Sequence, residues 1–174
     1  MEHFDDQIVT CENVLFVFAS ENTQLTFRGI YIRASNTGFN SIQGNTISRI
    51  RYVTSFVQSN SNCFTAIQIN SGVYSIGDTT ANVIGGDTGS GLIDITYHHY
   101  FSATTRFIEI MDYASTSGVI KNNIIDGIRF SFDGTYEGNL ITIHGIFTGG
   151  ATEEALTLSI DNNRIGSLTV PNSI

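Results

Sequence analysis

The sequence predicts an all-β chain that folds as a right-handed parallel β-helix, a solenoid whose coils stack along one axis. Three observations lead to this prediction: β-branched residues dominate the composition, apolar residues alternate in short bursts, and these features recur with a period close to 40 residues. We expect each ~40-residue sequence repeat to divide into two coils of about 20 residues. Roughly eight coils at the strand spacing of about 4.8 Å would then form a rod about 40 Å long.

The composition favours strands joined by many tight turns. The chain has 24 Ile, 20 Thr and 9 Val against 7 Leu and 8 Ala, and residues branched at the β-carbon fit a pleated strand better than a helix. It also has 17 Gly and 15 Asn but one Pro, so the turns depend on residues that tolerate positive φ. We expect very little helix.

The clearest repeated element reads SIQGNTISRI at 41–50, VIKNNIIDGI at 119–128 and SIDNNRIGSL at 159–168. In each copy an apolar residue is followed by asparagine after three positions and by further apolar residues after five and eight. A degenerate fourth copy, TTANVIGGD, begins either at Thr79 without a gap or at Ile76 with three inserted residues. The four copies place asparagines at one recurring turn: Asn45, Asn82, Asn123 and Asn163.

These four asparagines have a predicted structural role. Asparagine tolerates the left-handed conformation that tight turns require. Its amide can also pass hydrogen bonds from one coil to the asparagine of the next coil. We therefore interpret them as structural turn asparagines and not as ligand contacts.

A second landmark supports the same period. The pairs Ile30/Ile32, Ile67/Ile69 and Ile108/Ile110 precede Ile42, Thr79 and Ile120 by twelve and ten residues. We predict a single domain over 1–174 with repeats at approximately 27–63, 64–104, 105–144 and 145–174. Residues 1–26 are expected to form an eroded first coil or cap, because Leu15 and Val17 lie 78 residues before Ile93 and Ile95. A propeller or sandwich with four strands per unit is the competing architecture, although a propeller needs four complete blades.

Charge and cysteine content exclude several classes of function. The net charge is −8 and Lys121 is the one lysine beside seven arginines, so nucleic acid is not an expected partner. No apolar run of 18 residues and no leader sequence is present in the printed chain, which predicts no membrane insertion. Cys11 and Cys63 lack neighbouring ligands at zinc spacing; two buried thiols are favoured and a disulfide stays open.

The elements NSIQGNTISRI, YSIGDTTANVIGG, GVIKNNIIDGI and LSIDNNRIGSL resemble the Asn-Ile repeats of pectin-lyase-like parallel β-helix proteins, particularly those of large secreted bacterial surface proteins. The resemblance covers roughly 27–170. It implies an extracellular or cell-surface location and a non-catalytic structural or adhesive segment. The same superfamily contains polysaccharide lyases and glycoside hydrolases, so the alternative is a carbohydrate-active β-helix or a carbohydrate-binding module. Because the acidic residues are scattered, we predict no catalytic residue, no metal site and no cofactor.

Two groups of side chains are candidates for ligand contact. Arg49 or Arg51 is expected to share a strand face with Arg129, near Asp94 and Asp126, which would form either a carboxylate-binding groove or, as the favoured interpretation, ordinary surface ion pairs.

The second group is Tyr97, His98, His99 and Tyr100. These rings would stack on a sugar if the segment is an exposed loop, whereas a loop folded back over the coils is the favoured interpretation. The expected partners are a carbohydrate or cell-surface ligand and a second copy meeting the open end of the solenoid.

Overall fold

The computed structural model describes residues 16–20, 27–33, 39–54, 61–86, 93–98, 105–112, 115–133, 141–149, 157–166 and 168–169. The described residues form strands and turns and contain no helix. Every strand pairing among them is parallel. The chain is therefore all-β and built from stacked parallel strands, an arrangement compatible with a solenoid.

The strands belong to four sheets. Sheet 1 contains β2 (Phe27–Ile32), β6 (Ser61–Ile69), β10 (Thr105–Asp112) and β14 (Ile141–Thr148). Sheet 2 contains β3 (Phe39–Ile42), β7 (Gly72–Ile76), β11 (Ser115–Lys121) and β15 (Thr157–Asp161). Sheet 3 contains β4 (Thr46–Ile47), β8 (Val83–Gly85), β12 (Ile124–Asp126) and β16 (Arg164–Ile165). Sheet 4 contains β1 (Phe16–Ser20), β5 (Ile50–Thr54), β9 (Ile93–His98), β13 (Ile128–Asp133) and β17 (Leu168–Thr169).

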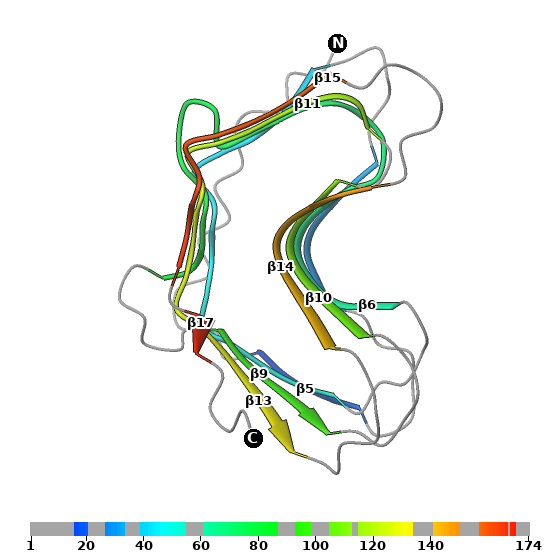
Figure 1. Cartoon of the computed structure of the whole chain (residues 1–174), viewed down its shortest axis with the longest axis vertical. Coiled ribbons are helices and arrows are strands. Elements are labelled where there is room, and N and C mark those ends of the chain that lie inside the picture. The colour runs from blue at the N-terminus through cyan, green and yellow to red at the C-terminus, as the bar shows by residue number, and fades with distance from the viewer. Residues whose placement is uncertain are drawn as a thin grey trace.

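The chain visits the sheets in the order 1, 2, 3, 4 before it returns to sheet 1, and each strand pairs with the strand four places later. Figure 1 shows the four sheets following one another around a common interior, with sheet 1 bent toward it. We call one passage through the four sheets a circuit. The described strands form four circuits, β2–β5, β6–β9, β10–β13 and β14–β17, preceded by β1.

The prediction of two coils for each repeat is wrong. Ile42 pairs with Ile76, and Ile76 pairs with Ile120, so strands one whole repeat apart are direct neighbours. Each repeat therefore contributes one circuit with four short strands. Four circuits at the usual strand spacing give a stack about 20 Å deep, half the expected length and half the expected eight coils.

The register also decides how the repeats align. Ile76, and not Thr79, occupies the position of Ile42 and Ile120, so the second copy of the asparagine element carries three inserted residues. In sheet 1, Ile67 pairs with Ile30 and with Ile110. The expected match of Ile67 with Ile108 is therefore two residues out of register, because connections between strands differ in length from one circuit to the next.

The first strand also differs from its prediction. Phe16 pairs with Ile50, which pairs with Ile93. The proposed match of Val17 with Ile95 is thus wrong by one position along the strand, and a shift of one residue moves a side chain to the other face of a sheet. Leu15 lies outside the described residues.

The interior is filled by residues that repeat from circuit to circuit. Phe27 stacks on Phe64 with ring centroids 4.7 Å apart, and Tyr52 packs against both rings. Isoleucines form two further interior columns, which are sets of residues paired in register across successive strands: Ile42, Ile76, Ile120 and Ile160 in sheet 2, and Ile47, Ile84, Ile125 and Ile165 in sheet 3. Full burial of one such side chain contributes about 1.5–3 kcal/mol.

Candidate functional site

The four repeat asparagines form a ladder of side-chain hydrogen bonds between sheets 2 and 3. The Asn45 Nδ2 donates to Asn82 Oδ1 at 2.9 Å, the Asn82 Nδ2 donates to Asn123 Oδ1 at 2.8 Å, and the Asn123 Nδ2 donates to Asn163 Oδ1 at 2.9 Å. Asn82 and Asn123 are fully buried. The structure therefore brings together four residues that lie 37 to 41 positions apart in the sequence.

Three of the four ladder amides also bind the backbone of the preceding circuit. The Nδ2 atoms of Asn82, Asn123 and Asn163 donate to the carbonyls of Ile42, Ile76 and Ile120 at 2.8, 3.0 and 2.8 Å. The backbone N–H groups of Asn45 and Asn123 donate to the Oδ1 of the next asparagine at 3.0 Å. A buried polar group is costly without such partners, so these bonds explain why asparagine occupies the position.

The left-handed residue of the turn is not the ladder asparagine. Positive φ occurs one residue earlier, at Gly44, Asn122 and Asn162. The expectation that Asn45, Asn123 and Asn163 adopt this conformation is therefore wrong, because the turn places the permissive residue outside and directs the next side chain inward. Asn162 donates to Asn122 Oδ1 at 2.8 Å and so forms a second, exposed rung beside the ladder.

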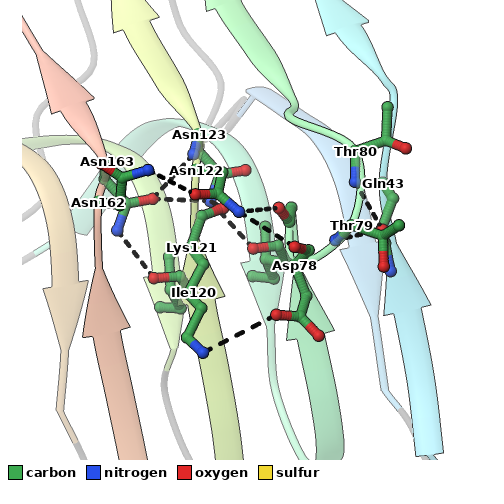
Figure 2. Close-up of polar contacts among 12 residues, drawn as sticks. Gln43, Asp78, Thr79, Thr80, Ile120, Lys121, Asn122, Asn123, Asn162 and Asn163 are labelled. Atoms are coloured by element: carbon green, nitrogen blue, oxygen red, sulfur yellow. Dashed lines mark hydrogen bonds and ion pairs between the residues drawn. The ribbon is translucent and has the colours of Figure 1, made fainter.

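The three-residue insertion of the second circuit lies on the outside of this corner, as Figure 2 shows. The Gln43 Oε1 accepts hydrogen bonds from the N–H groups of Thr79 and Thr80 at 2.8 and 2.9 Å. On the opposite side, Asn122 Nδ2 donates to the Asp78 carbonyl at 3.0 Å, and Lys121 Nζ lies 3.9 Å from the Asp78 carboxylate. Circuits on both sides thus fix the inserted residues.

The predicted arginine face lies on sheet 4 and contains Arg51, Arg129 and Asp94. Arg51 and Arg129 both pair in register with Asp94, and Arg129 forms a bidentate ion pair with its carboxylate. This hydrogen bond raises the pKa of Arg129. Arg49 is outside the strand with a positive φ. The face therefore has the surface ion pair that the sequence interpretation favoured.

Asp126 does not join this arginine face. Its side chain is largely buried and accepts hydrogen bonds from the backbone N–H of Gly127 at 2.7 Å and from Arg164 at 3.2 Å. The carboxylate thus closes the turn between sheets 3 and 4 and connects the third circuit to the fourth.

A second cluster of polar and aromatic groups lies on sheet 1. Arg28 donates to Gln68 Oε1 at 2.7 Å, and its guanidinium lies 5.2 Å from the centre of the Tyr31 ring. The Gln68 amide reaches Asn70 Oδ1 at 3.4 Å. Tyr31 is 46% exposed, so its ring is accessible beside two amide groups and a cation.

Aromatic and basic groups also lie on β10 and β14, the two strands of sheet 1 beyond β6. Tyr31 aligns with Gln68, Gln68 with Met111, and Met111 with Phe147. His144 packs edge-on against Phe147, with ring centroids 5.2 Å apart, and Arg106 lies 5.9 Å from the same ring.

One buried hydroxyl lies on β6, beside β2. Thr65 pairs in register with Arg28 and is fully buried, and no hydrogen-bond partner for its Oγ1 occurs among the described residues.

We call Arg28, Tyr31, Gln68, Asn70, Arg106, His144 and Phe147 the sheet 1 face.

Sequence reasoning missed the sheet 1 face. Tyr31 and Phe147 recur at one register position, but the repeats must be aligned with the correct corner insertions before this recurrence is visible. The alternation of Arg28, Tyr31 and Gln68 with apolar residues was the available signal.

The aromatic candidate segment is only partly described. Tyr97 lies in β9 with its side chain 4% exposed, edge-on against Phe107 at a centroid distance of 5.9 Å. It is therefore a core residue and does not offer a stacking surface. His98 ends β9, while His99 and Tyr100 lie outside the described residues, so ligand contact by these three stays a prediction.

Cys63 is a free thiol in the core, and burial raises its pKa to about 12. Cys11 lies outside the described residues. In the part of the chain that the structure describes, no group of three or more His, Cys, Asp or Glu side chains is arranged to hold a metal ion. No helix within the described ranges is long and apolar enough to span a membrane.

The geometry thus offers a buried asparagine ladder, whose amides are used between circuits, and an accessible face on sheet 1. The chain matches no protein-family model, no curated protein sequence and no solved structure.

Proposed function

We propose that this chain is a right-handed parallel β-helix that acts as a non-catalytic structural or adhesive segment of an extracellular bacterial surface protein. The path of the chain supports the architecture, since each strand pairs in parallel with the strand of the next repeat. In a solenoid of this kind stability is the sum of contacts between neighbouring circuits. The Asn-Ile elements that resemble repeats of secreted bacterial surface proteins support the location.

The asparagine ladder is the observation that carries the structural role. Its amides could serve as ligand contacts only if they were accessible and free to bond. Instead Asn82 and Asn123 are fully buried and bind both neighbouring circuits. The most regular polar feature of the repeat therefore serves cohesion along the stack.

Charged side chains support the same conclusion, because they too connect circuits. Arg129 of β13 binds Asp94 of β9, and Arg164 of β16 binds Asp126 of β12. These carboxylates already have cationic partners, which is the usual arrangement on a structural strand face.

An assay of polysaccharide breakdown tests the non-catalytic role. The full chain is incubated with neutral and uronate polysaccharides while new reducing ends and unsaturated products are measured. We expect no product above the blank. The control is Thr46→Ala, at an exposed position of sheet 3. Product formation that Asp94→Asn abolishes and Thr46→Ala leaves unchanged would overturn the structural role in favour of the enzyme.

Carbohydrate binding without catalysis is the second candidate function, and the sheet 1 face favours it. An exposed aromatic ring packs on the C–H face of a sugar, and amides and guanidinium groups bind its hydroxyls. Tyr31, Arg28 and Gln68 provide these three groups within one cluster. The acidic net charge favours a neutral glycan over an acidic one.

A glycan array followed by calorimetry tests this candidate. We expect Tyr31→Ala to reduce binding of a captured neutral glycan at least tenfold and Asn163→Ala to leave it unchanged. Equal binding by Tyr31→Ala and the parent chain would exclude the sheet 1 face as the binding surface.

A further inference from the structure

The fourth circuit has an exposed face whose counterparts in the earlier circuits are buried. Ile160 and Ile165 continue the two isoleucine columns, yet their side chains are 49% and 56% exposed, whereas Ile120 and Ile125, their partners in the third circuit, are 0% and 2% exposed. Large exposed aliphatic side chains at an open sheet edge indicate a contact surface.

The structure shows three times what covers such a face. Each earlier circuit is covered by the next one, which places an isoleucine on each column and an asparagine on the ladder. The face formed by Ile160, Asn163 and Ile165 is the fourth copy of the same surface. Its complement is therefore seen within this chain, at the junctions of circuits one to four.

The Asn-to-Asn hydrogen bonds of the ladder all run from one circuit to the next. This direction further defines the group that would fit the open face. Within the stack, each asparagine offers its backbone N–H or Nδ2 to the Oδ1 of the next circuit. The carbonyl of the column isoleucine in the same circuit (Ile42, Ile76 or Ile120) accepts from the next Nδ2. The Asn163 Nδ2 donates to Ile120, and among the described residues no acceptor lies on its open side. A primary amide is the group that both accepts there and donates to the Ile160 carbonyl.

We propose that this end docks one further parallel circuit carrying the sequence pattern Ile-x-x-Asn-x-Ile. The two isoleucines cover Ile160 and Ile165, and the asparagine accepts from Asn163. The other end of the two isoleucine columns differs, since Ile42 and Ile47 are already buried, so among the described residues of these columns the open surface is that of Ile160 and Ile165. The proposal deepens the structural role and rests on the parallel stacking proposed above.

The direction of the ladder distinguishes this occupant from a second copy bound end to end through the same surface. Such a two-fold pairing places the donors of Asn163 against the donors of its symmetry mate, so the Asn-to-Asn hydrogen bond of the ladder cannot continue across it. A following circuit provides the acceptor. The end-to-end contact expected from the sequence therefore takes the form of parallel addition of a repeat.

An extended chain tests the proposal within one molecule, where the high effective concentration of the added circuit removes any limit from weak affinity. A copy of residues 129–168 is inserted between Leu168 and Thr169, a position that keeps the phase because Leu168 pairs with Ile128. The reporter is Ile165→Cys in the original circuit, in a Cys11→Ser background. The matched control carries Asn163→Asp in the copied segment alone, which keeps the shape of the amide but removes its donor.

We expect the reporter thiol to react with a water-soluble disulfide reagent at least about tenfold more slowly in the extended chain than in the unextended chain. The Asn163→Asp copy should restore most of the reactivity. Cys63 is the internal control for folding, because it is buried and must stay unreactive in every variant.

Two results overturn the proposal: a reporter that reacts equally fast with and without the added circuit, or an Asp copy that protects as well as the Asn copy. A dimer of the unextended chain, detected by light scattering and abolished by Ile165→Asp, would also overturn it in favour of the two-fold pairing. None of these results depends on the polysaccharide assay, so failure of the docking proposal and failure of the structural role are distinguishable.

Discussion

The third and fourth circuits carry nearly the same sequence element and have very different surroundings. VIKNNIIDGI contributes Ile120 and Ile125, which are 0% and 2% exposed, whereas SIDNNRIGSL contributes Ile160 and Ile165, which are 49% and 56% exposed. Strand pairing and asparagine contacts to the preceding circuit are alike in both. What differs, within the described residues, is that a following circuit covers the third circuit and none covers the fourth.

This comparison shows that a repeat element specifies one half of a contact. Its residues are buried only when circuits lie on both sides, so the same isoleucine contributes unequally along the stack. Substitutions at matched positions should therefore have large effects in the third circuit and small ones in the fourth.

The isoleucine column should show the largest difference. Ile120→Ala removes a fully buried side chain and leaves a cavity, so we expect a loss of about 3–4 kcal/mol in the free energy of unfolding. Ile160→Ala should cost about 1 kcal/mol or less, because its side chain is half exposed. Urea unfolding followed by circular dichroism measures both, and equal losses would contradict the comparison.

The ladder should show the next largest difference. Asn123→Ala leaves the Ile76 carbonyl and the Asn82 amide without their partner in the interior, which should cost about 2–3 kcal/mol. Asn163→Ala removes fewer buried contacts and should cost about 1 kcal/mol. The same unfolding experiment compares the two variants, and a larger loss for Asn163→Ala would show that the ladder is not anchored in the central circuits.

A glycine pair tests the close approach of the backbones at the turn after sheet 3. Gly85 has φ +87°, and a β-carbon there would overlap the Asp126 carbonyl oxygen, so Gly85→Ala should cost about 2 kcal/mol. A β-carbon at Gly166 meets its nearest atom, Asp126 Oδ2, at 4.0 Å. Gly166→Ala should change the midpoint of urea unfolding by an amount near the error of the measurement, and equal shifts would contradict this difference in space.

Alkaline pH should destabilise the core gradually, through the two buried acidic protons of Cys63 and Tyr52. Burial raises the pKa of Cys63 from 9.0, and that of Tyr52 from 10.0, to about 12. Because the folded chain holds these protons more tightly, their stabilisation is complete below about pH 9 and is lost as the pH rises toward 12. The slope is at most about 1.4 kcal/mol per pH unit for each group.

The Cys63→Ala variant checks this alkaline effect. Unfolding midpoints between pH 8 and 11 should fall less steeply in the variant than in the parent chain. An identical slope would mean that the thiol does not remain protonated in the folded state at these pH values.

The sequence predicted the parallel strands and the period because isoleucine and asparagine recur at fixed offsets within one short element. It did not predict the number of coils, since dividing 40 residues into two coils of 20 satisfies the same periodicity. Pairing of Ile42 with Ile76 requires knowledge of the register. The three residues inserted after Ile76 are a local change that spacing alone cannot distinguish from a gapless match at Thr79.

The candidate site was less predictable for the same reason. Arg129 and Asp94 were expected to be near each other and form an ion pair. Tyr97, expected as a possible ligand contact in a loop, is buried, because the strand continues through it and directs its ring inward. The cluster of Arg28, Tyr31 and Gln68 depends on pairing between strands of different circuits, which no local pattern encodes.

Hydrogen exchange of three backbone amides tests the one-circuit-per-repeat stack and its direction most directly. The N–H groups of Asn45 and Asn123 donate to the Oδ1 of the following circuit, and the Asn163 N–H has no such partner among the described residues. We predict slow exchange at Asn45 and Asn123 and fast exchange at Asn163, measured by NMR under native conditions. Fast exchange at Asn123, or exchange at Asn163 as slow as at Asn123, would contradict the account.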